Sequence, residues 1–413
     1  MPEFLMLSTP KDARERILEA LRADRKYSLE RLATPAAIGR VSGREIRAPH
    51  PLPMFNRSTV DGYAVRAEDT FGASESLPAY FRVVAEIPMG QETSLTLRNM
   101  EAALIHTGGM LPSNANAVVM LEQTQRVAEH EIEVYRAVSA WENTIRIGEE
   151  VKEGEIILPV HKRVRDVEVG GLLALGITEV EVVKKPIVGI ISSGDEVIPP
   201  DHPLKVGQVR DINTYTLSGL VRRYGGEPLP YGILPDQEEE FRKALNELKP
   251  QCDFILITAG SSVSARDYTA RVINQMGEPG ILVHGINTRP GKPTILAVCD
   301  GKPIVGLPGN PMSAYVIALH FVKPILALLQ GLPVEEFVAG VEATLTVNLN
   351  SMAGREDWIP VRLIRDEQGV RADPVFGKSN MILALSRADG LVCIPAPATG
   401  LSAGERVLVE LIE

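Results

Sequence analysis

The sequence contains few cysteines and few aromatic residues. Its 413 residues include 3 cysteines, Cys252, Cys299 and Cys393, which lie far apart and lack the spacing of a metal site. We expect them to be buried thiols in a reducing compartment, because disulfides and thiolate ligands need closely matched pairs. The sequence therefore argues against a disulfide-stapled scaffold and against a cysteine-ligated metal centre.

Long blocks of one charge sign and long uninterrupted apolar runs are also missing. The chain has 53 acidic and 43 basic residues, a net charge of −10 and no block of five or more like charges. This distribution argues against an extended nucleic-acid surface. The most apolar stretch, residues 314–329, is interrupted by His320, Lys323 and Pro324. We expect a cytoplasmic protein that is neither secreted nor embedded in a membrane.

The sequence does have a central segment, residues 185–332, in which four apolar runs each end in a glycine-bearing turn. Two of the runs, residues 186–191 and 254–258, are β-branched without polar alternation, which is typical of parallel strands covered on both faces. The turns are residues 192–196, 259–267, 288–293 and 306–311. Because strand-end loops of an open α/β sheet meet at one crevice, we expect all four turns to line one site.

Helical patterns separate these strands. The patterns at residues 215–224 and 236–248 open at Asn213 and Asp236, whose side chains are common helix caps. For Asp236, capping and a functional role remain equal alternatives. Capping is likewise the simple alternative for Asp267, which begins another predicted helix.

Three further helices are predicted elsewhere. Residues 9–21 and 28–38 have helical patterns near the start of the chain. A long helix is predicted for residues 312–330, after a turn in which Asn310 is placed as the cap and Pro311 as the first-turn proline. The amino end of such a helix favours phosphate.

The strand-end turns bring acids and bases together. Crowded carboxylates such as Asp195, Glu196 and Asp267 repel one another unless a divalent cation bridges them, and oxygen ligands suit Mg²⁺. Arg289 and Lys292 are suited to binding anions. Arg266, Ser261, Ser262 and Ser264 add further donors, and the backbone amides of that turn can cradle an oxyanion.

The flanking regions are rich in short strands. Prolines preset the loop at residues 48–62, and residues 63–138 follow as a β-rich unit. Ordinary turns are the simple alternative for Asp61-Gly62 and for Thr107-Gly108-Gly109. Residues 338–413 alternate apolar and polar positions, which is typical of a small β-barrel or sandwich. Arg355 and Ser379 fall in its turns, where exposure is the default.

Five motifs occur along the chain in a fixed order. They are Ser58–Val65, Thr107–Gly109, Ser193–Glu196, Arg289–Pro293 and Gly306–Pro311. Together they closely resemble the molybdopterin molybdenumtransferase family, often called MoeA, which includes the E domain of gephyrin. The resemblance covers nearly the whole chain.

The resemblance implies a multidomain α/β plus β fold in an elongated homodimer. The implied domains are an N-terminal linker domain of residues 1–48 and 139–184, a β-rich insertion domain of residues 49–138, a three-layer α/β/α molybdopterin-binding domain of residues 185–332, and a C-terminal β-barrel domain of residues 333–413.

The resemblance also implies the reaction. Molybdate is inserted into adenylylated molybdopterin, which forms molybdenum cofactor and releases AMP with the help of Mg²⁺. The implied catalytic and magnesium-binding acids are Asp195, Glu196, Asp236 and Asp267. The implied molybdate-binding residues are Arg289, Lys292, Pro293, Arg355 and Ser379. The implied pterin-substrate residues are Ser261, Ser262, Ser264, Arg266, Gly309 and Asn310.

The resemblance further implies that the active site is shared between subunits. Asp61 and Thr107 match positions that the insertion domain presents to the neighbouring subunit's active site. The implied partners are molybdopterin adenylyltransferase and the enzymes that receive the cofactor.

The chain departs from the family pattern in one turn. In residues 259–267, Ser262 and Ala265 stand where many members have glycine, and Arg266 adds a positive charge that compensates for the lost backbone freedom. Two alternative functions remain. One is a non-catalytic dimeric scaffold or cofactor carrier, and the other is an adenylyltransferase, which the extra flanking domains argue against.

Overall fold

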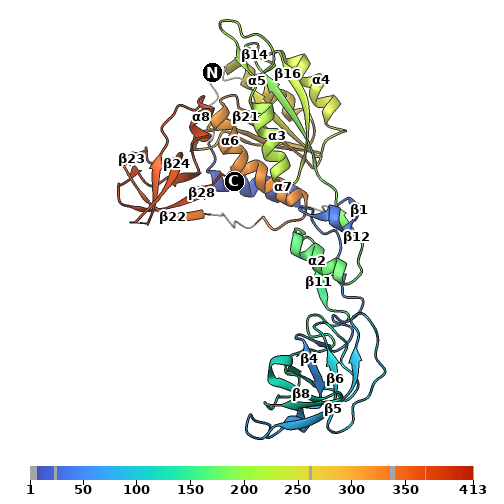
Figure 1. Cartoon of the computed structure of the whole chain (residues 1–413). Coiled ribbons are helices and arrows are strands. Elements are labelled where there is room, and N and C mark those ends of the chain that lie inside the picture. Colours follow the sequence, from blue (N-terminus) through green and yellow to red (C-terminus); the bar gives the residue numbers. More distant parts are fainter. Residues whose placement is uncertain (1–6, 23–25, 260–262, 335–339, 368, 413) are drawn as a thin grey trace.

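The molecule is elongated, with two folded ends joined by a slender middle (Figure 1). The computed structural model describes residues 7–22, 26–259, 263–334, 340–367 and 369–412, and for residues 263–267 it describes the backbone alone. An α/β unit and a β-barrel lie together at one end, and a β-rich unit lies at the other. This confirms the predicted multidomain α/β plus β architecture.

A six-stranded mixed sheet forms the centre of the α/β unit. Its spatial order is β16 (Glu227–Leu234), β13 (Ile187–Ser193), β17 (Phe254–Ala259), β21 (Lys302–Pro308), β20 (Ile295–Cys299) and β18 (Pro279–His284). The first four strands are parallel, and β20 and β18 run antiparallel to their neighbours. All residues of β17 are buried, as its unbroken apolar sequence predicts.

Helices cover both faces of this sheet. One buried cluster joins the strands to α1 (Pro10–Arg22), α3 (Asn213–Arg223) and the long helix that begins with α6 (Pro311–Ile317). The other joins them to α4 (Glu238–Leu248) and α5 (Val263–Asn274). The division inferred from the sequence groups α1 with the linker region, yet its apolar face packs on the central sheet.

The long helix is continuous from Pro311 to Leu329. It comprises α6, a π-helical turn η4 (Ala318–Val322) and α7 (Lys323–Leu329). By length and composition it is apolar enough to cross a membrane, but 67% of its most apolar window is buried within the protein. It therefore has the burial that is typical of a core helix.

A closed barrel of five strands packs beside the α/β unit. Its strands, in order around the barrel, are β24 (Glu356–Asp366), β25 (Gly369–Pro374), β22 (Gly340–Leu345), β28 (Arg406–Leu411) and β26 (Gly390–Ile394), and β26 returns to β24. A short strand of the α/β unit, β19 (Thr288–Arg289), pairs with β24 in parallel. This pairing joins a strand-end turn of one unit directly to the barrel.

The slender middle begins with a strand that the sequence did not predict. Residues 28–38 were expected to form a helix, and this was wrong, because β1 (Leu29–Ala33) pairs antiparallel with β12 (Glu179–Val183) and η1 (Thr34–Ala37) follows. A partner strand about 150 residues away in sequence overrides the local helical pattern. The middle also contains β2 (Ile46–Arg47), β11 (Ile156–Leu158) and α2 (Asp166–Ala174).

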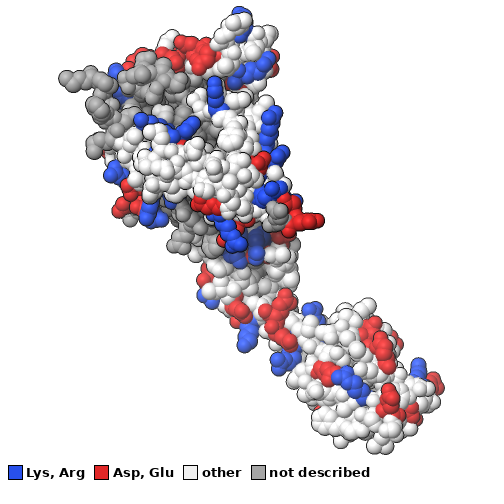
Figure 2. All heavy atoms as spheres, turned by 90° about the vertical axis from the view of Figure 1, so that its left-hand side faces the viewer, with Lys and Arg blue, Asp and Glu red and all other residues white. Residues whose placement is uncertain are grey.

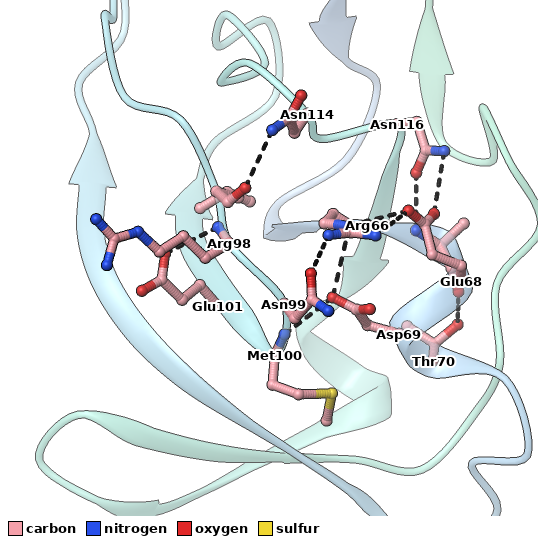
Figure 3. Close-up of polar contacts among 12 residues, drawn as sticks. Arg66, Glu68, Asp69, Thr70, Arg98, Asn99, Met100, Glu101, Asn114 and Asn116 are labelled. Atoms are coloured by element: carbon pink, nitrogen blue, oxygen red, sulfur yellow. Dashed lines mark hydrogen bonds and ion pairs between the residues drawn. The ribbon is translucent and has the colours of Figure 1, made fainter.

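The β-rich unit is a six-stranded sheet at the far end of the molecule. Its order is β7 (Ala117–Met120), β4 (Gly62–Val65), β6 (Glu101–Ile105), β5 (Ala79–Ile87), β9 (Glu131–Val134) and β8 (Thr124–Ala128). Figure 3 shows a polar network that ties three of its loops together around Arg66. The Arg66 guanidinium binds Glu68 at 2.7 Å and also contacts Asn99, and Asp69 accepts from the Met100 amide at 2.9 Å.

The remaining elements are short. They are β3 (Arg57–Ser58), η2 (Ala67–Thr70), η3 (Leu121–Gln123), β10 (Thr144–Ile145), β14 (Val197–Ile198), β15 (Val209–Arg210), β23 (Leu349–Asn350), α8 (Ile382–Leu385) and β27 (Gly400–Leu401). On the face shown in Figure 2, acidic and basic side chains are interspersed along the whole length, and neither sign forms a continuous field.

Candidate active site

A large basic cavity lies between the α/β unit and the barrel. Its volume is about 1130 Å³, and its walls include the ends of β17 and β21, the turn at residues 289–293 and the barrel segment at residues 375–379. Its charged lining residues are Arg289, Lys292, Arg355 and Lys378. Within the described part of the chain no aspartate or glutamate lines this cavity, so its field favours an anion.

The turn at residues 289–293 is folded back on itself. Thr294 Oγ1 donates to the Gly291 carbonyl at 2.6 Å, and the Ile286 amide donates to the Lys292 carbonyl at 2.9 Å. Gly291 has φ +114°, and a Cβ there would lie 2.2 Å from Ile317 Cδ1. Only glycine fits this position, and the tight turn places the flanking Arg289 and Lys292 on one cavity.

A buried carboxylate behind the cavity holds its two arginines. Asp357 is fully buried, and it accepts from Arg355 Nε at 2.8 Å and from Arg355 Nη2 at 3.2 Å. Arg289 Nη1 lies 3.8 Å from the same carboxylate. The register of β19 on β24 causes this, because it pairs Arg289 with Asp357. Sequence reasoning missed Asp357, and its only signal was an acid two positions after Arg355 in an apolar strand.

The turn before the long helix is tied to the barrel by Asn310 and Ser379. Asn310 occupies the cap position without the expected side-chain cap bond, and its Nδ2 donates to Ser379 Oγ at 3.1 Å. The Ser379 carbonyl accepts from the Met312 amide at 3.1 Å. The barrel therefore supplies the partner of a helix amide that a local cap usually satisfies. Pro293, Gly309, Asn310 and Ser379 all line the basic cavity.

Of the predicted acids, Asp195 alone is among the described residues that line a second, smaller cavity, of about 600 Å³. Asp195 lines it at the ends of β13 and β16. The Asp236 amide donates to Asp195 Oδ1 at 3.2 Å, and the Tyr268 hydroxyl donates to Asp236 Oδ1 at 3.3 Å. Gly194 allows the sharp turn into this group, because it has φ +141° and a Cβ would lie 2.8 Å from Glu196 Oε2.

The electrostatics of this acid group suit a cation. Burial raises the pKa of the Asp236 carboxyl, and the nearby charges of Asp195 and Glu196 raise it further. Within the described ranges, no lysine or arginine forms an ion pair with these three acids, and no cluster of three or more possible metal ligands is formed. Among the described side chains this charge has no basic partner, and carboxylates without a complete ligand cluster fit a divalent cation that also binds ligand oxygens.

Part of the predicted acid set lies outside the described residues. Residues 260–262 are not described, and only the backbone of residues 263–267 is. The predicted roles that fall there are those of Ser261, Ser262, Ser264, Arg266 and Asp267. The same applies to the departure at Ser262 and Ala265.

The four turns do not line a single cavity in the described structure. The turns at residues 288–293 and 306–311 line the basic cavity together with Ala259, whereas Gly194 and Asp195 line the second cavity. The two cavities lie side by side along the sheet edge, since β13 neighbours β17. Tyr268 connects the acid group to the basic cavity, because its hydroxyl binds Asp236 and its neighbour Thr269 lines the basic cavity.

Three helix starts differ from the predictions. Helix α5 begins at Val263, so Asp267, which was expected to begin it, lies within it. Helix α4 begins at Glu238 after Gln237, so Asp236 is not its cap and the capping alternative for Asp236 is wrong. Asn213 is the first residue of α3 rather than its cap, and Asp211 Oδ1 accepts from the Thr214 amide at 3.2 Å instead. The side chains of Asp236 and Asn213 are thereby available for contacts outside their own helix.

Asp61 and Thr107 lie together in the distant β-rich unit. Asp61 Oδ1 accepts from the Thr107 amide at 2.7 Å and from its hydroxyl at 3.2 Å, and these bonds lower the pKa of the Asp61 carboxyl. Asp61 precedes β4 and Thr107 follows β6. Both strands lie at the opposite end of the molecule from the α/β unit and its basic cavity (Figure 1). One chain alone therefore does not bring them to that cavity.

This fold and its cavity define a class of protein: a multidomain α/β protein that offers a basic cavity at strand ends, beside a β-barrel, with no acidic side chain among the described lining residues. Family models match most of the chain. They are the MoeA N-terminal region (domain I and II) at residues 8–176, the probable molybdopterin binding domain at residues 189–328, and the MoeA C-terminal region (domain IV) at residues 342–412.

Relatives match along nearly the whole chain. A putative molybdopterin biosynthesis protein of Methanocaldococcus jannaschii is 35% identical, with 91% of this chain and 90% of that protein covered. A molybdopterin molybdenumtransferase of Haemophilus influenzae is 32% identical over 96% of this chain and 97% of its own. The crystal structure of a molybdopterin biosynthesis MoeA protein from Pyrococcus horikosii superposes with a TM-score of 0.83 at 34% identity, covering 98% and 99% of the two chains. The chain belongs to the molybdopterin molybdenumtransferase (MoeA) family.

Proposed function

We propose that this protein is a transferase that inserts molybdenum into molybdopterin, as the names of its relatives indicate for them. In finer detail, molybdate is inserted into adenylylated molybdopterin, and water cleaves the phosphoanhydride, so that AMP leaves and the phosphate stays on the pterin. One observation carries this proposal: the basic cavity contains four cationic side chains and, in the described structure, no acidic one. Such a cavity suits a tetrahedral dianion.

Molybdate is held at the seam between the α/β unit and the barrel. Arg289 and Lys292 approach from the turn after the sheet, and Arg355 approaches from the barrel. Asp357 fixes the guanidinium of Arg355, so less side-chain freedom is lost when the anion binds. Ser379 and Asn310 supply neutral donors, and Pro293 shapes the wall.

The adenylylated pterin spans both cavities. Its phosphate is placed near Gly309 and Asn310, where the long helix begins. We assign pterin contacts to Ser261, Ser262, Ser264 and Arg266 by their match to the family's motif.

Asp195, Glu196 and Asp236, with Asp267, would hold Mg²⁺. The bound ion would supply charge stabilisation for the leaving phosphate. The chain's own carboxylates keep the ion next to the basic cavity, and the Tyr268 hydroxyl orients Asp236. The uncompensated charge of the described acids supports this role.

Each active site is completed by a second copy of the chain. Asp61 and Thr107 are far from the basic cavity of their own chain, and both belong to motifs that the family presents across a homodimer. We also propose the four-domain division given by the resemblance, a cytoplasmic location, and exchange of substrate and product with an adenylyltransferase and with molybdoenzymes. The three free thiols agree with a reducing compartment.

A reconstituted reaction tests this function. Purified protein is given adenylylated molybdopterin, molybdate and Mg²⁺, and AMP and cofactor able to activate an apo-molybdoenzyme are measured. The proposal requires both products, and both should depend on molybdate. If neither product forms, the alternative of a non-catalytic scaffold or cofactor carrier is favoured.

A further inference from the structure

Asn213 connects the two cavities, and no role has been assigned to it so far. It is the first residue of α3, between Asp211 and Thr214, which line the second cavity. Its Nδ2 donates to the carbonyl of Gly309 at 2.9 Å, and Gly309 lines the basic cavity. One side chain therefore joins the start of α3 to the turn that begins the long helix.

Burial of the Asn213 side-chain amide costs stability, so packing alone does not explain an asparagine at this position. The residue is 8% exposed, and its Oδ1 is buried without a hydrogen-bond partner. A buried acceptor without a partner costs stability, and an apolar side chain of similar size avoids that cost. Among the described residues, the side-chain amide of Asn213 makes one hydrogen bond, to Gly309, so this bond identifies what the amide does.

The Gly309 turn needs such an external support. Two further contacts of this turn come from the barrel, where Ser379 binds Asn310 at 3.1 Å and the Met312 amide at 3.1 Å. The barrel holds one side of the turn, and Asn213 holds the other from within the α/β unit. Without Asn213, the turn would lose the side-chain contact that ties the Gly309 carbonyl to α3.

We propose that Asn213 is a positioning residue for oxyanion binding. It fixes the Gly309 carbonyl so that the backbone amide and the side chain of Asn310 stand in place against the anion held by Arg289, Lys292 and Arg355. Asn213 itself does not line the basic cavity, so it acts through the turn. This inference rests on the proposed oxyanion site and adds a residue to it.

The test uses the full-length protein and measures the affinity for molybdate and, separately, thermal stability. Asn213→Leu removes both polar atoms and keeps most of the volume. Asn213→Asp keeps an acceptor in the same shape but loses the donor to Gly309. Ser218→Ala is the matched control, because Ser218 lies on the same helix, is buried, and also has a hydroxyl without a partner.

We expect Asn213→Leu to weaken molybdate binding about three- to tenfold while its melting temperature is equal to or above that of the natural protein. Asn213→Asp should bind at least as weakly, and Ser218→Ala should bind normally. The proposal is overturned if either Asn213 variant binds like the natural protein, or if binding falls only in step with melting temperature across all three variants. If the natural protein itself binds no molybdate, the proposed function fails rather than this inference.

Discussion

The carboxylate of Asp357 and the guanidinium of Arg355 face each other through two hydrogen bonds, of 2.8 Å and 3.2 Å, at the back of the basic cavity. The acid is fully buried, and 28% of the arginine side chain is exposed toward solvent and cavity. Asp357 therefore orients the Arg355 guanidinium without itself contacting the ligand.

Asp357→Asn separates positioning from charge. By Coulomb's law alone, the loss of a negative charge near an anion site strengthens anion binding. If Asp357 acts by orienting Arg355, molybdate affinity should instead fall, by about tenfold, because a charge-assisted pair contributes about 1.5–3 kcal/mol to an ordered geometry. Calorimetric titration measures this. Asp366→Asn, which loosens a pair with Arg371 elsewhere in the barrel, is the control and should leave the affinity unchanged.

Gly291→Ala should damage both stability and the cavity. The new Cβ would lie 2.2 Å from Ile317 Cδ1 in a backbone with φ +114°. We expect a loss of about 2–4 kcal/mol in unfolding free energy, from overpacking and backbone strain together. Gly354→Ala is the matched control, because Gly354 has φ +99° and open space around it. Equal losses in the two variants, measured by chemical denaturation, would show that the Ile317 contact is unimportant.

The raised pKa of Asp236 gives a stability prediction with a definite sign. Its folded pKa lies above the unfolded value of 3.8, so the native state binds more protons than the unfolded state between those two values. The contribution of Asp236 to the free energy of unfolding therefore falls as the pH rises from the unfolded pKa through the folded pKa of this carboxyl. Asp236→Asn should raise the melting temperature at neutral pH, and the gain should vanish below about pH 3.8. A gain that is the same at every pH would contradict the electrostatic cause.

Hybrid dimers test the shared site. A subunit with Asp61→Asn is co-expressed with a subunit carrying Lys292→Ala, and the hybrid is isolated by two affinity tags. If Asp61 serves the partner's cavity, the hybrid has one intact site and one doubly altered site, so about half of the natural activity should return. AMP release is the readout, and each variant homodimer is the control. A hybrid that stays as inactive as the homodimers would show that Asp61 does not serve the partner's cavity, and a fully active Asp61→Asn homodimer would place Asp61 outside the reaction.

Local sequence patterns were enough to predict the central sheet and the basic turns. The unbroken apolar runs of β13 and β17 specify buried parallel strands, and the glycine and proline positions of residues 289–293 specify a tight turn after a strand. These features depend on neighbouring residues alone, so they can be read before the fold is known.

Contacts between distant segments could not be predicted in this way. Asp357 appears in the sequence as an acid within a strand, for which exposure is the usual expectation, but the pairing of β24 with β19 buries it against two arginines. Asn213 and Asn310 have the composition of helix caps, yet both reach other segments, Gly309 and Ser379 respectively. The strand β1 shows the same effect, because its partner β12 decides its conformation.

The central claim is that bases of one cavity hold molybdate while acids of the neighbouring cavity serve the transfer. Calorimetric titration of molybdate into Lys292→Ala and into Asp236→Asn, each followed by the AMP-release assay, tests it most directly. We predict that Lys292→Ala weakens molybdate binding at least about tenfold, whereas Asp236→Asn binds molybdate normally and releases little AMP. Loss of molybdate binding in Asp236→Asn together with normal binding in Lys292→Ala would contradict the account.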